Sequence, residues 1–205
     1  VSASKGTPIS ARPFERSIKH AAPSNSPGCW RTTAMHSREE TPVVTISSTM
    51  TTRSVAFHNG DCVGGGCGIA LACDIRVATR RSRLGITPAK LGLVYPLQDI
   101  KLLLDLVGTG QAKKMLYTGE LYSAEAALDI GLIQEISDDV DALALAIAEN
   151  SAHSIHEMKA LTRRILDGQA DEDTDSKRVF ADALTKPDFL EGTAAFLEKR
   201  KPEFR

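Results

Sequence analysis

The chain has 205 residues, which is enough for one well-buried α/β domain or for one domain with an appendage. Its formal net charge of −1 gives no general reason to expect a nucleic acid or an anionic membrane as partner. Its longest apolar runs fall far short of the roughly 20 residues of a membrane-spanning helix, so we expect no membrane partner. The spacing of the four cysteines fits neither a disulfide framework nor a zinc knuckle, so we expect reduced, partly buried thiols and no metal at Cys29, Cys62, Cys67 and Cys73.

The composition of the chain changes near residue 60. Residues 1–60 contain no Leu and no Asp and carry 7 Lys or Arg against 3 Glu, whereas residues 61–205 carry 18 Lys or Arg against 23 Asp or Glu. Residues 1–41 show no hydrophobic period, so we predict a poorly ordered segment there. It is a targeting peptide, a linker, or sequence that has lost its relation to the domain by truncation or a shifted reading frame, and we favour the last. The reduced thiols favour the cytoplasm, and a targeting peptide would favour the mitochondrial matrix.

Residues 42–138 are predicted to mix strands with helices. β-branched residues favour strands at Val43–Ser47 and Ser54–His58. The next predicted elements are a helix opened by glycines at Gly66–Ala72, a strand at Asp74–Thr79, and a strand and loop over residues 82–96. Apolar stripes then predict helices at Ile100–Val107 and Ala112–Tyr117, which end at Gly108 and before Gly119, and a helix capped by Ser123 that ends at Gly131, before a strand at Leu132–Ser137.

From Asp139 onward the pattern is helical throughout. Four amphipathic segments are separated by Ser151–Ser154, by an acidic stretch at residues 171–175 and by Pro187. Strands mixed with helices first and helices alone at the end predict an α/β core with a helical C-terminal region.

Three consecutive glycines, Gly64–Gly66, precede a run of small apolar residues. Missing side chains let another group approach the backbone closely, and N–H groups at a helix start can hold an anion. The dinucleotide pattern G-x-G-x-x-G fails in both registers, because Ile69 or Leu71 stands at its last position, and no Lys-Ser or Lys-Thr follows as in a phosphate loop. An oxyanion hole and simple tight packing of helix against sheet both remain open.

The stretch VGGGCGIALACDIRVA resembles the enoyl-CoA hydratase/isomerase family, also called the crotonase superfamily, whose members carry a run of glycines followed by LALACDI and a strand. The similarity continues from Asp61 to Arg205 through LGITPAKLGLVYP, LVGTGQAKKMLYTGELYSAEAALDIGLIQEI and DFLEGTAAFLEKRKPEF. It implies a spiral of β-β-α turns, incomplete here, over residues 42–138. It also implies that the helical region 139–205 builds a homotrimer or hexamer. The implied substrate is an acyl-CoA thioester, with coenzyme A as part of the substrate and no separate cofactor.

The resemblance assigns the Gly65 N–H as one of two backbone donors that hold a thioester enolate, with Gly64 and Gly66 beside the bound thioester. The thioester oxygen must then come within about 3 Å of the amide, which explains the lack of side chains. The second donor of the family lies in a Ser-Ala-Gly-Ala-Asp-like segment. The chain offers only Ala21 and Ala22 as a weak equivalent.

The catalytic positions depart from the family pattern. Where hydratases of the family carry two catalytic Glu residues, this chain has Gly68 and Pro88, so we do not expect water addition by such a pair. The segment ITPAKLGLVYP resembles the methylmalonyl-CoA decarboxylase branch, in which a Tyr at the position of Tyr95 addresses the substrate carboxylate. A half-buried Tyr95 with its hydroxyl bonded to a loop is the alternative.

The basic end of the chain offers one further candidate. The resemblance places Lys199 and Lys201 near the CoA phosphates, in a neighbouring subunit, whereas a solvated helix end is the competing interpretation. We therefore expect an acyl-CoA-binding protein that acts through an enolate. A methylmalonyl-CoA-type decarboxylase using Tyr95 and a catalytically inactive CoA-binding or structural subunit are the alternatives.

Overall fold

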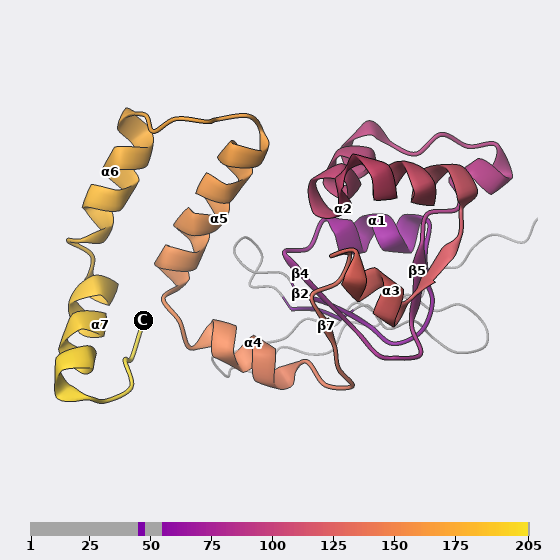
Figure 1. Ribbon diagram of the computed structural model, residues 1–205. Helices are drawn as coiled ribbons and strands as arrows, with labels where there is room; N and C mark the ends of the chain where they lie inside the picture. Colours follow the sequence, from indigo (N-terminus) through magenta and orange to yellow (C-terminus); the bar gives the residue numbers. More distant parts are fainter. Residues whose placement is uncertain (1–44, 48–54, 205) are drawn as a thin grey trace, which may run out of the picture.

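The computed structural model describes residues 45–47 and 55–204 of the chain (Figure 1). These residues form two small β-sheets and the helices that accompany them. The four-stranded sheet has the order β1 (Thr45–Ser47), β2 (Val55–His58), β4 (Ile75–Ala78) and β7 (Glu135–Ile136). The three-stranded sheet has the order β3 (Cys62–Val63), β5 (Arg83–Gly85) and β6 (Leu121–Ser123). β1 runs antiparallel to β2 and β6 antiparallel to β5, and the other neighbours are parallel.

Two successive β-β-α turns produce this arrangement. In each turn the first strand joins the four-stranded sheet, the second joins the three-stranded sheet, and a helix follows. β2, β3 and α1 (Gly65–Leu71) form one turn, and β4, β5 and α2 (Leu97–Thr118) form the next. Val55 lies opposite Ile75 between the first strands, and Cys62 opposite Leu84 between the second ones. The expected incomplete spiral of β-β-α turns is confirmed over residues 55–118.

Most predicted elements occur, with shifted ends. α1 begins at Gly65, one residue before the predicted start. α2 contains both predicted helices. Gly108 breaks the helical backbone between them, with φ 71° and ψ 167°. The Ser123 side chain accepts the Ala126 N–H at 3.2 Å and caps α3 (Ala124–Asp129), as predicted. Of the first two predicted strands, the ends at residues 43–44 and at Ser54 lie outside the described residues.

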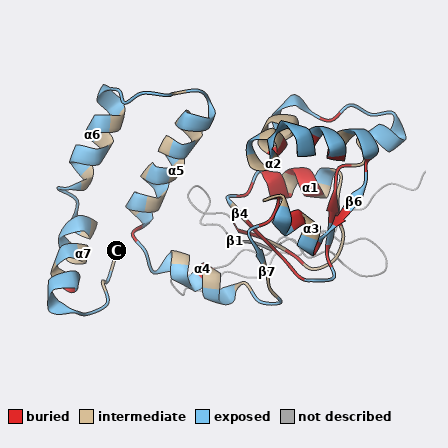
Figure 2. Cartoon of the chain, viewed as in Figure 1, coloured by how far each residue is buried: buried red, intermediate tan, exposed pale blue. Residues whose placement is uncertain are grey.

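Four helices follow residue 139, as predicted: α4 (Asp141–Ala148), α5 (Ala152–Leu166), α6 (Thr174–Ala183) and α7 (Pro187–Glu198). The boundary expected at Ser151–Ser154 is wrong by three residues, because the Ser151 side chain accepts the Ser154 N–H at 3.1 Å and α5 begins directly after this cap. Figure 1 shows α5, α6 and α7 to one side of the sheets, and Figure 2 shows them largely exposed. Among the described residues, no helix combines the length and apolar character needed to cross a bilayer.

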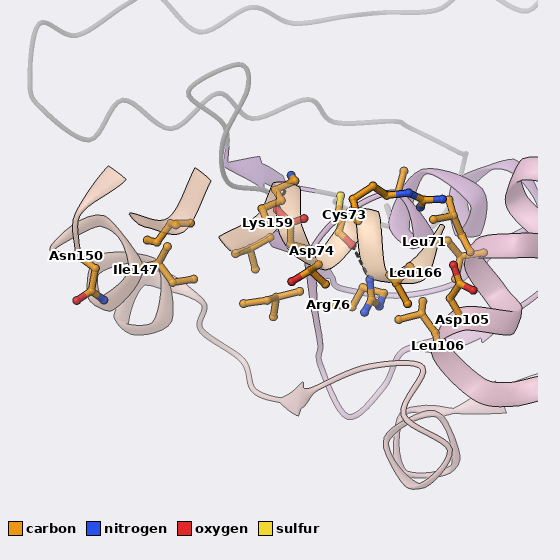
Figure 3. A pocket seen from close by; sticks show the side chains of 17 residues that line it. Leu71, Cys73, Asp74, Arg76, Asp105, Leu106, Ile147, Asn150, Lys159 and Leu166 are labelled. Atoms are coloured by element: carbon orange, nitrogen blue, oxygen red, sulfur yellow. Dashed lines mark hydrogen bonds and ion pairs between the residues drawn. The ribbon is translucent and has the colours of Figure 1, made fainter. Parts of the chain in front are cut away.

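The C-terminal helices meet the core beside the end of α1. Lys159 of α5 donates to the Asp74 carboxylate at 2.8 Å, and Lys101 of α2 donates to the Leu166 carbonyl at 3.0 Å. Between these contacts lies a mainly apolar cavity of about 650 Å³ (Figure 3). The ion pair of Asp74 with Lys159 joins the turn after α1 to α5.

A buried arginine connects α1 to the segment after α3. Arg76 of β4 is 1% exposed, and its Nε donates to the Leu132 carbonyl at 2.7 Å. One terminal nitrogen donates to the Cys73 carbonyl at 2.7 Å (Figure 3) and the other to Gln134 Oε1 at 2.9 Å. Burial lowers the pKa of Arg76, but a guanidinium keeps its charge in proteins. The side chain therefore brings positive charge to the C-terminal carbonyls of α1, where it is stabilising.

Candidate functional site

α1 begins at a turn that requires glycine. Gly64 has φ 57° and ψ −119°, a backbone conformation that side chains rarely permit. Its N–H donates to the Gly85 carbonyl of β5 at 3.0 Å, which fixes the turn on the three-stranded sheet. A Cβ atom on Gly64 would lie 3.9 Å from Thr87 Oγ1, so the dihedral angles and not a lack of space require glycine here.

Gly65 and Gly66 border open space. A Cβ atom on either residue would meet no atom of the described residues within 4 Å, the backbone of α1 itself left aside, and Gly65 is exposed. The first N–H groups of an α-helix have no partner within the helix. The Gly65 N–H is therefore available to a group that approaches from solvent.

Tyr95 holds the peptide unit that carries the Gly65 N–H. Its hydroxyl donates to the Gly64 carbonyl at 3.1 Å, and the same oxygen accepts the Gly68 N–H at 3.0 Å. The C=O and N–H of a trans peptide point in opposite directions, so these two bonds direct the Gly65 N–H away from the phenol. Tyr95 is only 7% exposed, and burial raises its pKa, which keeps the hydroxyl a donor at neutral pH. We interpret Tyr95 as a positioning residue for the Gly65 amide.

The sequence leaves two roles open for the Tyr95 hydroxyl: contact with a substrate carboxylate, or a hydrogen bond to a loop. The bond to the Gly64 carbonyl corresponds to the hydrogen bond to a loop. The hydroxyl donates to the Gly64 carbonyl at the start of α1. Its action on a substrate carboxylate stays a prediction.

We expect the replacement Tyr95→Phe to lower the free energy of unfolding by about 1 kcal/mol, because one part-buried hydrogen bond is lost while the Gly64 carbonyl keeps its bond to Gly68. A positioning role predicts that the variant binds acetyl-CoA and methylmalonyl-CoA more weakly by the same factor. Titration calorimetry with both thioesters measures this. A loss confined to methylmalonyl-CoA would instead assign the phenol to the substrate carboxylate.

Two side chains fill the space beside Gly68, the position at which the family resemblance expects a catalytic carboxylate. A Cβ atom there would lie 2.8 Å from the Tyr95 hydroxyl oxygen and 3.0 Å from Asp99 Oδ2, closer than Cβ atoms normally come to other groups. A Glu at this position would therefore have to displace both side chains. Asp99 comes from the first turn of α2, and sequence reasoning missed it, because nothing in the local pattern separates it from an ordinary acidic residue at a helix start.

Pro88, where the family resemblance expects the second catalytic carboxylate, begins the short 3-10 helix η1 (Pro88–Leu91). The preceding Thr87 lies near Gly64, so this loop borders the glycine turn. Pro88 brings no ionisable group to it.

The structure does not bring the two C-terminal lysines to the glycine turn. Lys199 ends α7 in the left-handed conformation, with φ 55°, and Lys201 forms an ion pair with Glu149. Figure 1 shows α7 on the opposite side of the molecule from α1. A role for Lys199 and Lys201 at CoA phosphates therefore needs the site of a neighbouring subunit and stays a prediction.

Cys62, Cys67 and Cys73 are buried, and none of these three described cysteines forms a disulfide with another described residue. A hydrogen bond with Cys67, together with burial, raises the pKa of Cys62, which keeps that thiol protonated. Among the described residues, no group of three or more His, Cys, Asp or Glu side chains could hold a metal ion. Cys29 and the candidate second-donor segment at Ala21 and Ala22 lie outside the described residues.

Comparisons with known proteins agree with this architecture. The model of the enoyl-CoA hydratase/isomerase family matches residues 32–205. A putative enoyl-CoA hydratase of Thermus thermophilus is 38% identical over 159 residues, which are 74% of this chain and 62% of that protein. The short-chain-enoyl-CoA hydratase of Clostridium acetobutylicum is 32% identical over 158 residues, covering 73% and 60%.

Solved structures show the same relationship. A putative enoyl-CoA hydratase/isomerase family protein from Hyphomonas neptunium superimposes with a TM-score of 0.70 at 38% identity, covering 74% of this chain and 60% of that one. DspI of Pseudomonas aeruginosa gives a TM-score of 0.70 at 36% identity, with 75% and 61% covered. The chain thus spans about three fifths of the length of these relatives. Its β-β-α turns and its glycine-led helix have the crotonase fold, and the chain belongs to the enoyl-CoA hydratase/isomerase family.

Proposed function

We propose that this protein binds an acyl-CoA thioester and stabilises its enolate through the Gly65 N–H. The observation that carries the proposal is the peptide unit between Gly64 and Gly65, whose carbonyl is held by Tyr95 and Gly68, while Gly65 itself is exposed and a Cβ atom on it would meet open space. A fixed donor of this kind stabilises negative charge as it develops on a carbonyl oxygen, without reorganising during the reaction. Relatives named as enoyl-CoA hydratases support a thioester as the substrate class.

We infer the reaction class from the absence of an ionisable side chain at Gly68 and at Pro88. Adding water across a double bond requires one group to deprotonate water and one to protonate the α-carbon, and neither of these positions supplies such a group. Moving a proton between carbons of a thioester enolate needs only one base beside the oxyanion donor. Proton transfer or isomerisation of an acyl-CoA is therefore the activity we propose. A CoA-binding subunit without turnover is the second candidate, favoured by the same two residues.

A test of the oxyanion donor compares the unsubstituted chain with Gly65→Pro. Proline is tolerated at the first position of a helix, so this change removes the N–H and preserves α1. We expect calorimetry to show that acetyl-CoA binds about tenfold more weakly to the variant, in line with the loss of one hydrogen bond. Free coenzyme A has no thioester carbonyl and serves as the matched control ligand, with unchanged affinity. If the unsubstituted chain binds no acyl-CoA, the proposed function is wrong.

For the assembly, we propose a homotrimer or hexamer built through the C-terminal helices. Large apolar side chains are exposed there, among them Phe180 at 70%, Phe196 at 82% and Leu197 at 74%. Apolar patches of this kind mark interaction surfaces. Light scattering after size exclusion should give three or six times the chain mass of 22.1 kDa, and Phe196→Glu should lower that mass. A monomer before substitution would contradict the proposal.

A further inference from the structure

We propose that Asp99 is the catalytic base of this site and supplies, from α2, the carboxylate that is absent at Gly68. The inference rests on the proposed enolate chemistry and adds the residue that moves the proton. The observation behind it is the close approach of Asp99 in α2 to Gly68 in α1. Asp99 Oδ2 and Cγ lie 3.0 Å and 3.5 Å from the position that a Cβ atom on Gly68 would take.

The position of the Asp99 side chain depends on the absence of a side chain at Gly68. Gly68 is buried in α1, and α1 contacts α2. Any side chain at Gly68 would have to enter the volume that the Asp99 carboxylate and the Tyr95 hydroxyl occupy. Glycine at this position is thus the condition for Asp99 to reach α1.

The register of α1 brings the carboxylate to the side of the helix that carries the oxyanion donor. Gly65 and Gly68 are three residues apart, so they lie on one helix face at a spacing of roughly 5–6 Å. The space at Gly65 is open, and Asp99 is only half-buried, which leaves its carboxylate access to solvent. We place the α-carbon of a thioester whose oxygen accepts the Gly65 N–H on the Asp99 side of this helix face.

Of the two oxygen-bearing groups beside Gly68, only Asp99 is suited to remove a proton. The Tyr95 hydroxyl proton is engaged by the Gly64 carbonyl, and burial keeps the phenol protonated. A carboxylate, in contrast, accepts protons readily and works as a general base when it lies within reach of the substrate.

The step balances within the protein and substrate. The α-carbon–hydrogen bond of the thioester breaks, its proton goes to an Asp99 carboxylate oxygen, and its electron pair forms the double bond to the carbonyl carbon. The carbonyl oxygen takes the negative charge and is held by the Gly65 N–H. Return of the proton to the α-carbon, or to the γ-carbon of an unsaturated chain, restores Asp99. No oxidant, reductant or cofactor is consumed.

The test is the exchange of α-protons of butyryl-CoA for deuterium in heavy water, followed by mass spectrometry, with acyl-CoA affinity measured in parallel. Asp99→Asn keeps the shape of the side chain and should reduce the exchange rate by about 100-fold or more, with affinity changed less than about threefold. Asp105→Asn, on the same helix and paired with Lys101, is the matched control and should stay within about twofold of the unsubstituted chain. Asp99→Glu should recover part of the rate.

The pH profile separates a catalytic base from a structural residue. Exchange by the unsubstituted chain should rise with pH as a carboxylate ionises and then level off, and Asp99→Asn should lack this rise. Full exchange by Asp99→Asn would overturn the role of Asp99 and leave the proposed function standing. An unsubstituted chain that binds butyryl-CoA without any exchange would overturn the enolate chemistry and the role of Asp99 together.

Discussion

Replacement of Arg76 by Met should lower the free energy of unfolding by about 3–5 kcal/mol, the largest effect we expect from any single substitution in the described core. The guanidinium satisfies the carbonyls of Leu132 and Cys73 and the Gln134 side chain, all in or next to the buried interior. Methionine fills a similar volume but donates no hydrogen bond. Each acceptor left without a partner costs about 1–3 kcal/mol.

Urea unfolding followed by circular dichroism measures this effect. Arg76→Lys should cost nearly as much, because an ammonium cannot reproduce the planar fork that reaches three acceptors. Arg80→Met is the matched control: Arg80 is exposed and forms one ion pair with Glu125, so its loss should change stability by less than about 1 kcal/mol. If Arg76→Met lowered the free energy of unfolding by less than about 1 kcal/mol, the buried hydrogen bonds of Arg76 would contribute little to stability.

Acidification should destabilise the protein by about 2 kcal/mol between pH 6.5 and pH 5, through His58. This side chain is 0% exposed, and among the described residues neither ring nitrogen has a hydrogen-bond partner. Burial, and then the nearby charge of Arg76, lower the pKa of His58 from its ordinary value of 6.5 to about 4. Between these two values the unfolded chain binds a proton that the folded chain does not. The stabilisation is therefore complete above about pH 6.5 and falls as the pH drops, by about 3 kcal/mol in all at pH 4.

Unfolding curves at pH 7, 6 and 5 measure this slope. His58→Leu should flatten it. Asp167 and Asp173 do not titrate between pH 6.5 and pH 5. Hydrogen bonds lower the pKa of both carboxyl groups, so their contributions to stability are lost only near and below about pH 4, the ordinary carboxyl range. Equal stability at pH 7 and pH 5 would contradict a buried neutral His58.

The sequence by itself determined the local elements, because their ends depend on residues close together in the chain. Ser123 caps α3 with its own side chain, as predicted. The helical backbone is interrupted at Gly108 and ends before Gly119, where the apolar stripes predicted helix ends, and both glycines adopt positive φ. The sequence also identified the family, through the glycine run and the motifs that follow it. Gly64 shows the physical basis of that signal, since its dihedral angles require glycine.

The tertiary structure alone decided which side chains meet at the site. Tyr95 and Asp99 lie 31 residues beyond Gly64 and Gly68 respectively, and the strands β4 and β5 and the 3-10 helix η1 lie between them along the chain. Local pattern cannot report such a contact, because it depends on where the second β-β-α turn lays α2 across α1. The sequence therefore located the glycine turn and showed Gly68 and Pro88 where the family resemblance expects carboxylates. The packing of α2 against α1 decided that a carboxylate from Asp99 stands beside Gly68 and that the Tyr95 hydroxyl aligns the Gly65 amide.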